Sequence, residues 1–257
     1  MENIGHDFYE KYGLEWRHTE RYEWEHMSTS YKVSNFISII DDLKPNRILD
    51  FGCGLGDALS LLAKHFHSES AVGIDISSTM IEYARKQYPE HTFVVGSIER
   101  LKDFRVDLIT FFDVLEHIED IQQVLEIAGT IAEYVGIGIP LEKTFYISLL
   151  NTLHLKEKKS RLYLLEGHVH EFNRSDFEAI LEAAHLKVVK AKNVFPTKEI
   201  QFSPYMKNRI KNKSGMLSRQ KYWLYIVLSF LPYWLTRHLF QIGAGTDLYV
   251  LCKRKTT

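Results

Sequence analysis

The sequence predicts an α/β fold in which helices cover both faces of a doubly wound, mostly parallel sheet. Short apolar runs alternate with helical patterns between residues 47 and 194. These runs are apolar at nearly every position, which is typical of strands buried on both faces. A glycine-rich loop joins the first run to the helix after it, as in sheets that bind a nucleotide-type ligand at the carboxyl ends of their strands.

The composition is that of a folded globular protein. The chain has 257 residues, of which 45% are hydrophobic and 25% charged, and these proportions argue against extensive disorder. The formal net charge of -1 argues against nucleic acid as a partner. Two isolated cysteines, Cys53 and Cys252, make neither a disulfide framework nor a zinc site, so no metal is expected. The first ten residues lack the apolar core of a signal peptide, and a cytoplasmic location is therefore expected.

Residues 1–44 predict a cap of N-terminal helices. Apolar side chains between Tyr31 and Leu43 recur at intervals of three and four residues, which marks one face of a helix. Pro45 and Asn46 end this pattern.

The sheet and its helices are predicted over residues 45–199 and 246–257. Strands are expected at Arg47–Phe51, Ala71–Ile76, Phe93–Val95, Val106–Phe112, Val135–Ile139, Lys187–Val194 and Asp247–Lys253. Helices are expected at Ala58–Phe66, Thr79–Tyr88, Asp120–Glu133 and from Ser175 to about His185. Pro140 is expected to close the fifth strand.

Capping residues mark two of these helices. Ser77 or Ser78 can cap the helix that Pro89 ends. Ser175 and Glu178 have the spacing of a capping box and predict the start of the last helix.

The segment from Asp50 to Gly56 has the features of a loop that holds a cationic ligand. Gly52, Gly54 and Gly56 allow sharp turns and a close approach of the ligand to the backbone. Asp50 ends the preceding strand, where its carboxylate would repel a pyrophosphate and attract an ammonium group. S-adenosylmethionine carries an ammonium and a sulfonium but no phosphate, so the loop favours this ligand over a dinucleotide.

Asp75 lies at the end of the second predicted strand, 19 positions after Gly56. An acid in this position can accept hydrogen bonds from both hydroxyls of a ribose. The alternative is that Asp75 only caps the helix that follows.

Three segments resemble motifs of the class I S-adenosylmethionine-dependent methyltransferase superfamily, most nearly its small-molecule branch. They read ILDFGCGLGDAL, VGIDIS and VDLITFFDVLEHIED, and the resemblance extends over about residues 45–195 and the final strand. It implies a seven-stranded, Rossmann-like sheet with an antiparallel last strand. It also implies S-adenosylmethionine as cofactor and methyl transfer to a small-molecule or lipid-like acceptor, with O-methylation as one option.

The resemblance also assigns roles to residues. Asp50 and the glycines Gly52, Gly54 and Gly56 would hold the methionine portion, and Asp75 would hold the ribose. Ile76, Ser97 and Ile98 would contact the adenine, although the family often has an acid where Ser97 stands. Asp113, Leu115, Glu116 and His117 would lie beneath the methionine, close to the active site.

Three histidines are candidates for a general base. His168 and His170 lie in a stretch that resembles the H-x-x-x-F-[ST] segment of small-molecule methyltransferases, and His117 lies close to the cofactor motif. An imidazole has a pKa near 6.5 and can accept a hydroxyl proton as the methyl group moves. The alternative for His168 and His170 is a structural histidine that bonds to a nearby backbone carbonyl. The alternative for His117, with Glu116, is that it only caps and solvates the start of a helix.

Residues 200–245 predict a basic, aromatic helical insertion before the last strand. The insertion holds seven Lys and Arg residues and no Asp or Glu. Its uncharged run, Tyr222–Thr236, is shorter than the ~20 apolar residues of a membrane span and contains Pro232. Three interpretations stay open: a hairpin packed on the core, a hydrophobic lid over the acceptor, or peripheral membrane contact through residues 200–242.

Two other functions are compatible with such a fold. The chain could bind S-adenosylmethionine without catalysis, because methyl transfer depends on alignment more than on one indispensable side chain. A nicotinamide-dependent oxidoreductase is disfavoured by Asp50 and by the lack of a Tyr-x-x-x-Lys pair after the fourth strand. The oligomeric state does not follow from the sequence.

Overall fold

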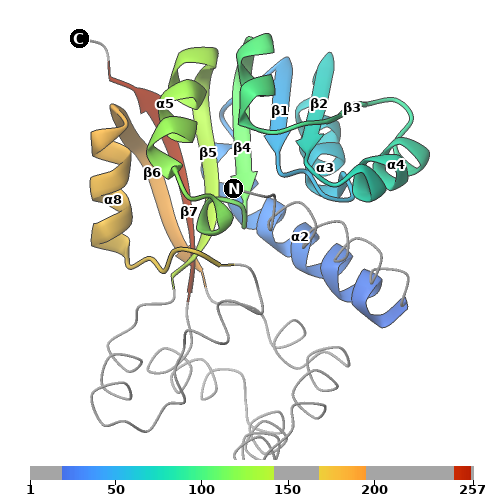
Figure 1. Cartoon of the computed structure of the whole chain (residues 1–257), viewed down its shortest axis with the longest axis horizontal. Coiled ribbons are helices and arrows are strands. Elements are labelled where there is room, and N and C mark those ends of the chain that lie inside the picture. The colour runs from blue at the N-terminus through green and yellow to red at the C-terminus, as the bar shows by residue number, and fades with distance from the viewer. Residues whose placement is uncertain (1–18, 142–167, 195–245, 256–257) are drawn as a thin grey trace, which may run out of the picture.

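The computed structural model describes residues 19–141, 168–194 and 246–255, which form a three-layer α/β structure (Figure 1). The expected insertion at 200–245 and the first 18 residues of the expected N-terminal cap lie outside the described residues. Within the described ranges, no helix has the length and apolar character needed to cross a membrane.

A seven-stranded sheet forms the middle layer, in the order β3-β2-β1-β4-β5-β7-β6. Its strands are β1 (Arg47–Phe51), β2 (Ser70–Asp75), β3 (Thr92–Val95), β4 (Val106–Phe112), β5 (Ala132–Leu141), β6 (Leu186–Val194) and β7 (Thr246–Arg254). Strands β1 to β5 pair in parallel, whereas β7 lies between β5 and β6 and is antiparallel to both. The predicted doubly wound sheet with an antiparallel last strand is confirmed.

Helices cover both faces of the sheet. They are α2 (Thr19–Ile40), α3 (Asp57–Phe66), α4 (Ser78–Gln87), α5 (Ile121–Ile131) and α8 (Arg174–Ala183), with short 3-10 helices η1 (Ile98–Asp103) and η2 (Leu115–His117). Apolar side chains of α2, α3 and α4 share one core with the sheet. Side chains of η1, α5 and α8 share the core on the opposite face.

Helix α2 is longer than its apolar spacing predicts. It begins at Thr19 rather than at Tyr31 and ends at Ile40, three residues before Leu43. Val33, Phe36 and Ile40 are buried, so the periodic half is the part that packs on the core. The preceding half is not apolar enough to reveal a helix by periodicity.

The expectation that Pro140 closes the fifth strand is wrong, because β5 continues to Leu141. Pairing with β4 stops at Gly138, and within the described residues Ile139 and Pro140 pair with β7 alone, before Leu141 forms a further bridge with Phe172. A proline lacks a backbone N–H and is tolerated where one side of a strand has no neighbour. The start of β5 was also predicted too late, since the chain passes directly from α5 into the strand at Ala132.

Serine caps α4 as expected, but not α8. The Ser77 side chain accepts a hydrogen bond from the backbone N–H of Met80 at 3.3 Å. At α8 the cap is Asn173, whose Oδ1 accepts from the backbone N–H of Asp176 at 2.8 Å. Ser175 only donates its hydroxyl to that same oxygen, so the predicted cap at Ser175 is wrong. Both side chains suit this role, and Asn173 starts the helix one residue earlier.

Helix α2 packs against β5 through Phe36, a contact that requires glycine at position 136. A Cβ built on Gly136 would lie 2.2 Å from Phe36 Cζ. Gly136→Ala is therefore expected to lower the free energy of unfolding by ~1–3 kcal/mol, measured by urea denaturation, because the added methyl overpacks the core. Gly129→Ala in α5 is the control, since its Cβ would meet only a flexible Leu186 methyl, at 3.1 Å. Equal losses in both variants would contradict this role of Phe36.

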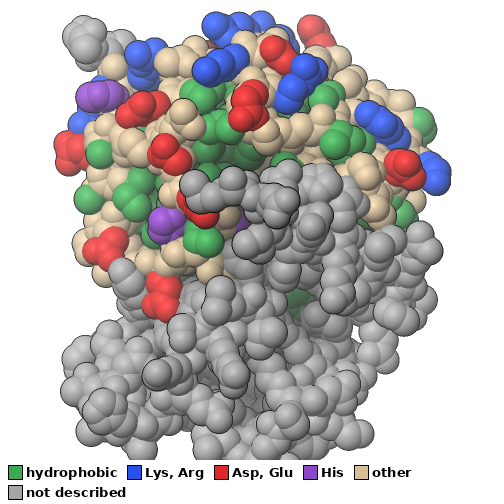
Figure 2. All heavy atoms as spheres, viewed as in Figure 1, with side chains coloured by type: hydrophobic (Ala, Val, Ile, Leu, Met, Phe, Trp, Pro, Cys, Tyr) green, Lys and Arg blue, Asp and Glu red, His purple; other side chains and the backbone are tan. Residues whose placement is uncertain are grey.

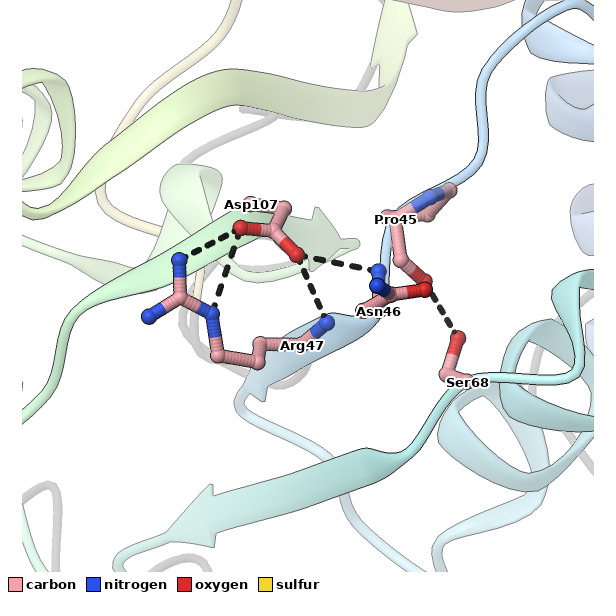
Figure 3. Close-up of polar contacts among 5 residues, drawn as sticks. All are labelled: Pro45, Asn46, Arg47, Ser68 and Asp107. Atoms are coloured by element: carbon pink, nitrogen blue, oxygen red, sulfur yellow. Dashed lines mark hydrogen bonds and ion pairs between the residues drawn. The ribbon is translucent and has the colours of Figure 1, made fainter.

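A group of polar contacts holds the start of β1 in place at the amino edge of the sheet (Figure 3). Asp107 at the start of β4 accepts hydrogen bonds from the backbone N–H groups of Asn46 and Arg47, both at 2.9 Å. The same carboxylate pairs with the Arg47 guanidinium at 2.6 Å. The hydroxyl of Ser68 donates to the Pro45 carbonyl at 2.6 Å. These contacts lie at the end of the strands opposite to the candidate site.

Candidate active site

The candidate residues gather at the carboxyl edge of the sheet, around the point where the strand order reverses. Strand β1 lies between β2 and β4, and the order runs outward in both directions from this pair. Asp50 is the fourth residue of β1, Asp75 ends β2, and Asp113 follows β4. Ligands of open α/β sheets bind in the crevice at such a switch point.

Three glycines shape the loop between β1 and α3. Gly52, Gly54 and Gly56 have φ angles of 74°, 50° and 85°, a region that disfavours other residues. Gly52 and Gly56 also pack closely, because a Cβ would lie 2.4 Å from Val114 and 2.7 Å from Phe93. A Cβ on Gly54 would meet only the Met80 sulfur, at 3.7 Å, so the backbone there is open to close approach by a ligand.

Asp75 joins this loop to the start of α4. One of its oxygens accepts from the Gly54 N–H at 2.8 Å and the other from the Ser77 N–H at 2.9 Å. A carboxylate can accept about four hydrogen bonds, so these contacts are compatible with ribose binding. The side chain that caps the helix is Ser77, which means that Asp75 is not merely a cap.

Asp50 is a buried carboxyl group beside the glycine loop. Its side chain is 2% exposed and accepts a hydrogen bond from the Thr110 hydroxyl at 2.7 Å. Burial, together with repulsion from Asp75, raises the pKa of Asp50 to about 7, against the opposing effect of Thr110. A ligand ammonium would offset this cost of burying a charge. The loop and Asp50 therefore fit S-adenosylmethionine, whose amino-acid end supplies that ammonium.

The residues expected near adenine lie around the end of β3. The Ser97 hydroxyl donates a hydrogen bond to Glu99, a bond that lowers the pKa of that carboxyl group. Ile76 and Ile98 are both partly buried, and Ile98 packs against the core. Glu99 was missed in the sequence, although it lies two positions after Ser97, where the resemblance leads one to expect an acid. Glu99, bonded to Ser97, thus places a carboxylate two positions after the one where the family often has an acid.

A charged cluster, formed by Lys32, Asp113, Asp247 and Tyr249, lies at the carboxyl ends of β4 and β5. Lys32 of α2 pairs with Asp113, which has a φ of 53° and donates its N–H to the Gly138 carbonyl at 2.9 Å. Tyr249 donates its hydroxyl to Asp247 at 3.3 Å. Burial would lower the pKa of Lys32, but attraction by Asp113 and Asp247 outweighs it and raises that pKa.

Removal of the Lys32 charge tests this cluster. Burial raises the pKa of Asp247 to about 6, and Lys32 holds it below the value that burial alone would give. Lys32→Met is expected to raise the pKa of Asp247 further, as measured by carboxyl ¹³C NMR titration. Lys190→Met is the control, because Lys190 pairs with the exposed Asp42 instead. An unchanged Asp247 titration in Lys32→Met would contradict the cluster.

The structure separates the three candidate histidines. The rings of His117 and His168 lie together, with centroids 4.6 Å apart. The His170 ring has a different partner, with Nε2 3.2 Å from the backbone oxygen of Glu119. Leu115 is completely buried in the core below them. His117 and His168, rather than His170, therefore lie side by side next to the β4 motif.

Known proteins with similar sequences share one kind of domain. The chain matches the family model "Methyltransferase domain" over residues 16–191. It is similar to trans-aconitate 2-methyltransferase of Rhodopseudomonas palustris (strain BisA53), with 37% identity over 59 residues, which are 23% of this chain and 22% of that protein. It is also similar to demethylmenaquinone methyltransferase of Thermotoga maritima, with 28% identity over 118 residues, 45% of this chain and 51% of that protein. The chain thus spans from about a fifth to about half of these relatives.

Solved structures resemble the fold more completely. Magnesium protoporphyrin IX methyltransferase of Synechocystis PCC 6803, with bound S-adenosylhomocysteine, has a TM-score of 0.61 at 14% identity, over 98% of this chain and 99% of that one. Phosphoethanolamine N-methyltransferase 2 of Haemonchus contortus has a TM-score of 0.57 at 15% identity, over 87% of this chain and 53% of that one. At these identities the likeness establishes the fold.

Proposed function

This chain belongs to the methyltransferase domain family, and from that premise we propose that it transfers the methyl group of S-adenosylmethionine to a small-molecule acceptor. The observation that carries the proposal is the buried carboxyl group of Asp50, adjacent to an open glycine loop at the sheet's switch point. Among the described residues, Thr110 and Asp75 act on this carboxyl group and neither is a cation, so the site is suited to a ligand that brings one.

In this proposal Asp50 and the backbone of the glycine loop bind the amino-acid end of S-adenosylmethionine. Asp75 binds the ribose, while Ile76, Ser97 and Ile98 contact the adenine. Asp113, Leu115 and His117 form the floor between cofactor and acceptor. S-adenosylmethionine supplies an electrophilic methyl group, so the protein contributes mainly alignment and exclusion of water.

We further propose that the methylated atom is an oxygen. The acceptor O–H loses its proton, a new O–CH₃ bond forms, the S–CH₃ bond breaks, and S-adenosylhomocysteine leaves. His117 or His168 would accept the proton, since the two imidazoles lie together beside the β4 motif. The matched relatives named for trans-aconitate and demethylmenaquinone differ widely in acceptor polarity, so either a polar or a lipid-like acceptor suits the proposal.

The charge pattern on one described face favours a small acceptor over a nucleic acid. On the described part of the face in Figure 2, Lys and Arg side chains are interspersed with Asp and Glu. A polyanion would be expected to bind a continuous basic stripe instead. A cytoplasmic location, with membrane contact through residues 200–242, stays a prediction.

A transfer assay with the full chain tests the proposed function. The protein is incubated with methyl-labelled S-adenosylmethionine and cell extract, and the label is separated into organic-soluble, water-soluble and macromolecular fractions. Label in either small-molecule fraction supports the proposal, and the fraction identifies the acceptor class. Label confined to macromolecules overturns it. Binding of the cofactor without any transfer would indicate a protein that binds S-adenosylmethionine without catalysis.

A further inference from the structure

Three potential metal ligands meet beside the β4 motif. One ligand atom each from Glu116, His117 and His168 lies within 4.8 Å of the other two. Glu116 is 1% exposed, and both histidines are partly buried. The carboxylate of the cluster is therefore shielded from solvent, and the two imidazoles are partly so, unlike a group of surface acids.

Backbone hydrogen bonds hold the two segments of this cluster together. The N–H groups of Val169 and His170 both donate to the Glu116 carbonyl, at 2.8 and 3.1 Å. The N–H of His117 donates to the Val114 carbonyl at 3.0 Å, which closes the turn of η2. His168 is thus fixed beside Glu116 and His117, although it lies far from them in sequence.

We propose that Glu116, His117 and His168 bind a single divalent transition-metal ion such as Zn²⁺. Imidazole nitrogens and one carboxylate are the ligands of many catalytic zinc sites and non-haem iron sites, whereas Mg²⁺ and Ca²⁺ prefer oxygen alone. Bonds of about 2.0–2.2 Å around a tetrahedral ion place its ligands roughly 3.3–3.5 Å apart. Small side-chain rotations would bring the three ligand atoms to that spacing.

The position of the cluster suggests what the ion would do. Val114, which precedes η2, packs on the cofactor loop, where a Cβ on Gly52 would lie 2.4 Å from it. With three protein ligands the ion retains an open position, as catalytic sites do. An acceptor hydroxyl bound there would have a lowered pKa and could release its proton to water. His117 and His168 would then be ligands of the ion, and the proton-accepting role proposed above would apply to the protein without metal. This role rests on the proposed function, whereas ion binding itself does not.

No metal-binding motif in the sequence predicts this site. Metal motifs are recognised by short, regular spacing of Cys and His, as in zinc fingers. Here one ligand comes from a separate segment that the fold brings back to η2. The expectation of no metal was based on cysteine number and did not consider this arrangement.

Titration with Zn²⁺ and Co²⁺ tests the proposal. The full-length protein is treated with a chelator, and binding is followed by isothermal titration calorimetry and by the visible absorption of bound Co²⁺. We expect one ion per chain. His168→Ala and Glu116→Gln are each expected to weaken binding at least tenfold.

His170→Ala is the matched control, because its imidazole lies in the same segment but bonds to Glu119. It is expected to bind the ion as wild type does. Circular dichroism and S-adenosylmethionine binding establish that each variant is folded. The proposal is overturned if wild type binds no stoichiometric ion, or if His170→Ala loses as much affinity as His168→Ala.

The outcome for the metal and the outcome for methyl transfer are separable. Stoichiometric ion binding without transfer would leave the site standing and the proposed function overturned. If the protein binds no ion and a chelator leaves methyl transfer unaffected, the metal site is overturned and the proposed function stands.

Discussion

Asp50→Asn should weaken S-adenosylmethionine binding about 10- to 150-fold, which corresponds to the ~1.5–3 kcal/mol of a hydrogen bond to a charged group. The asparagine has nearly the same shape, and its side-chain oxygen can still accept from the Thr110 hydroxyl, which lies 2.7 Å from the Asp50 carboxylate. Only the negative charge opposite the ligand ammonium is lost. Isothermal titration calorimetry on both proteins measures the change, and equal affinities would remove Asp50 from the cofactor site.

The same carboxyl group gives the affinity a pH dependence. Because the pKa of Asp50 is raised to about 7, the free wild-type protein carries more of the charged form as pH rises through that value. Wild-type affinity should therefore increase between about pH 6 and pH 8, and the Asp50→Asn profile should be flatter. If the affinity of Asp50→Asn depends on pH as the wild-type affinity does, the titrating group is not Asp50.

The free energy of unfolding should fall as pH rises, whereas the cofactor affinity should increase. The pKa of Asp50 is raised in the folded protein from ~3.9 in the unfolded chain, so its neutral form is the one that folding favours. The contribution of Asp50 is fully present below about pH 4 and is lost as pH rises through about 7. Urea denaturation without ligand should show this decline in wild type and a smaller decline in Asp50→Asn.

Asp75→Ala should also weaken cofactor binding about 10- to 150-fold, since it removes the expected ribose acceptor, worth ~1.5–3 kcal/mol. It also removes the acceptor for the Gly54 and Ser77 N–H groups, so the free energy of unfolding should fall as well. Both quantities are measured, the first by calorimetry and the second by denaturation.

Asp107→Ala is the matched control for this variant. Asp107 also accepts from two backbone N–H groups, but at the opposite edge of the sheet (Figure 3). Its loss should reduce stability and leave cofactor affinity unchanged. If both variants lose affinity equally, the effect of Asp75 is one of stability rather than of ribose contact.

The parts of the fold that the sequence predicts are those with a local signature. Strands β1 and β4 are mostly apolar, and their predicted bounds match those of the structure. The glycine loop was predicted because its backbone needs φ angles that glycine adopts readily. Pro140 was misjudged because the effect of a proline depends on whether a neighbouring strand is present, and pairing is not a local property.

The parts of the site that escaped prediction depend on contacts between distant segments. In the sequence, Lys32 is one polar residue of a predicted helix. Its ion pair with Asp113 arises only because α2 packs against the sheet. Asp247 was read as the first residue of a strand, and its place in the same cluster follows only from the pairing of β7 with β5. His168 likewise joins His117 through tertiary structure. Periodicity cannot reveal such pairs, because it describes one element at a time.

The placement of β7 between β5 and β6 has a consequence for synthesis on the ribosome. Strand β6 emerges before β7, yet β7 is its only direct partner among the described strands of the sheet. Until β7 emerges, the nascent chain leaves one side of β5 uncovered, and α8 with β6 cannot dock at its final position. Such an open strand edge invites pairing with other chains. Translation arrested before residue 246 should therefore yield an aggregation-prone product that depends on chaperones.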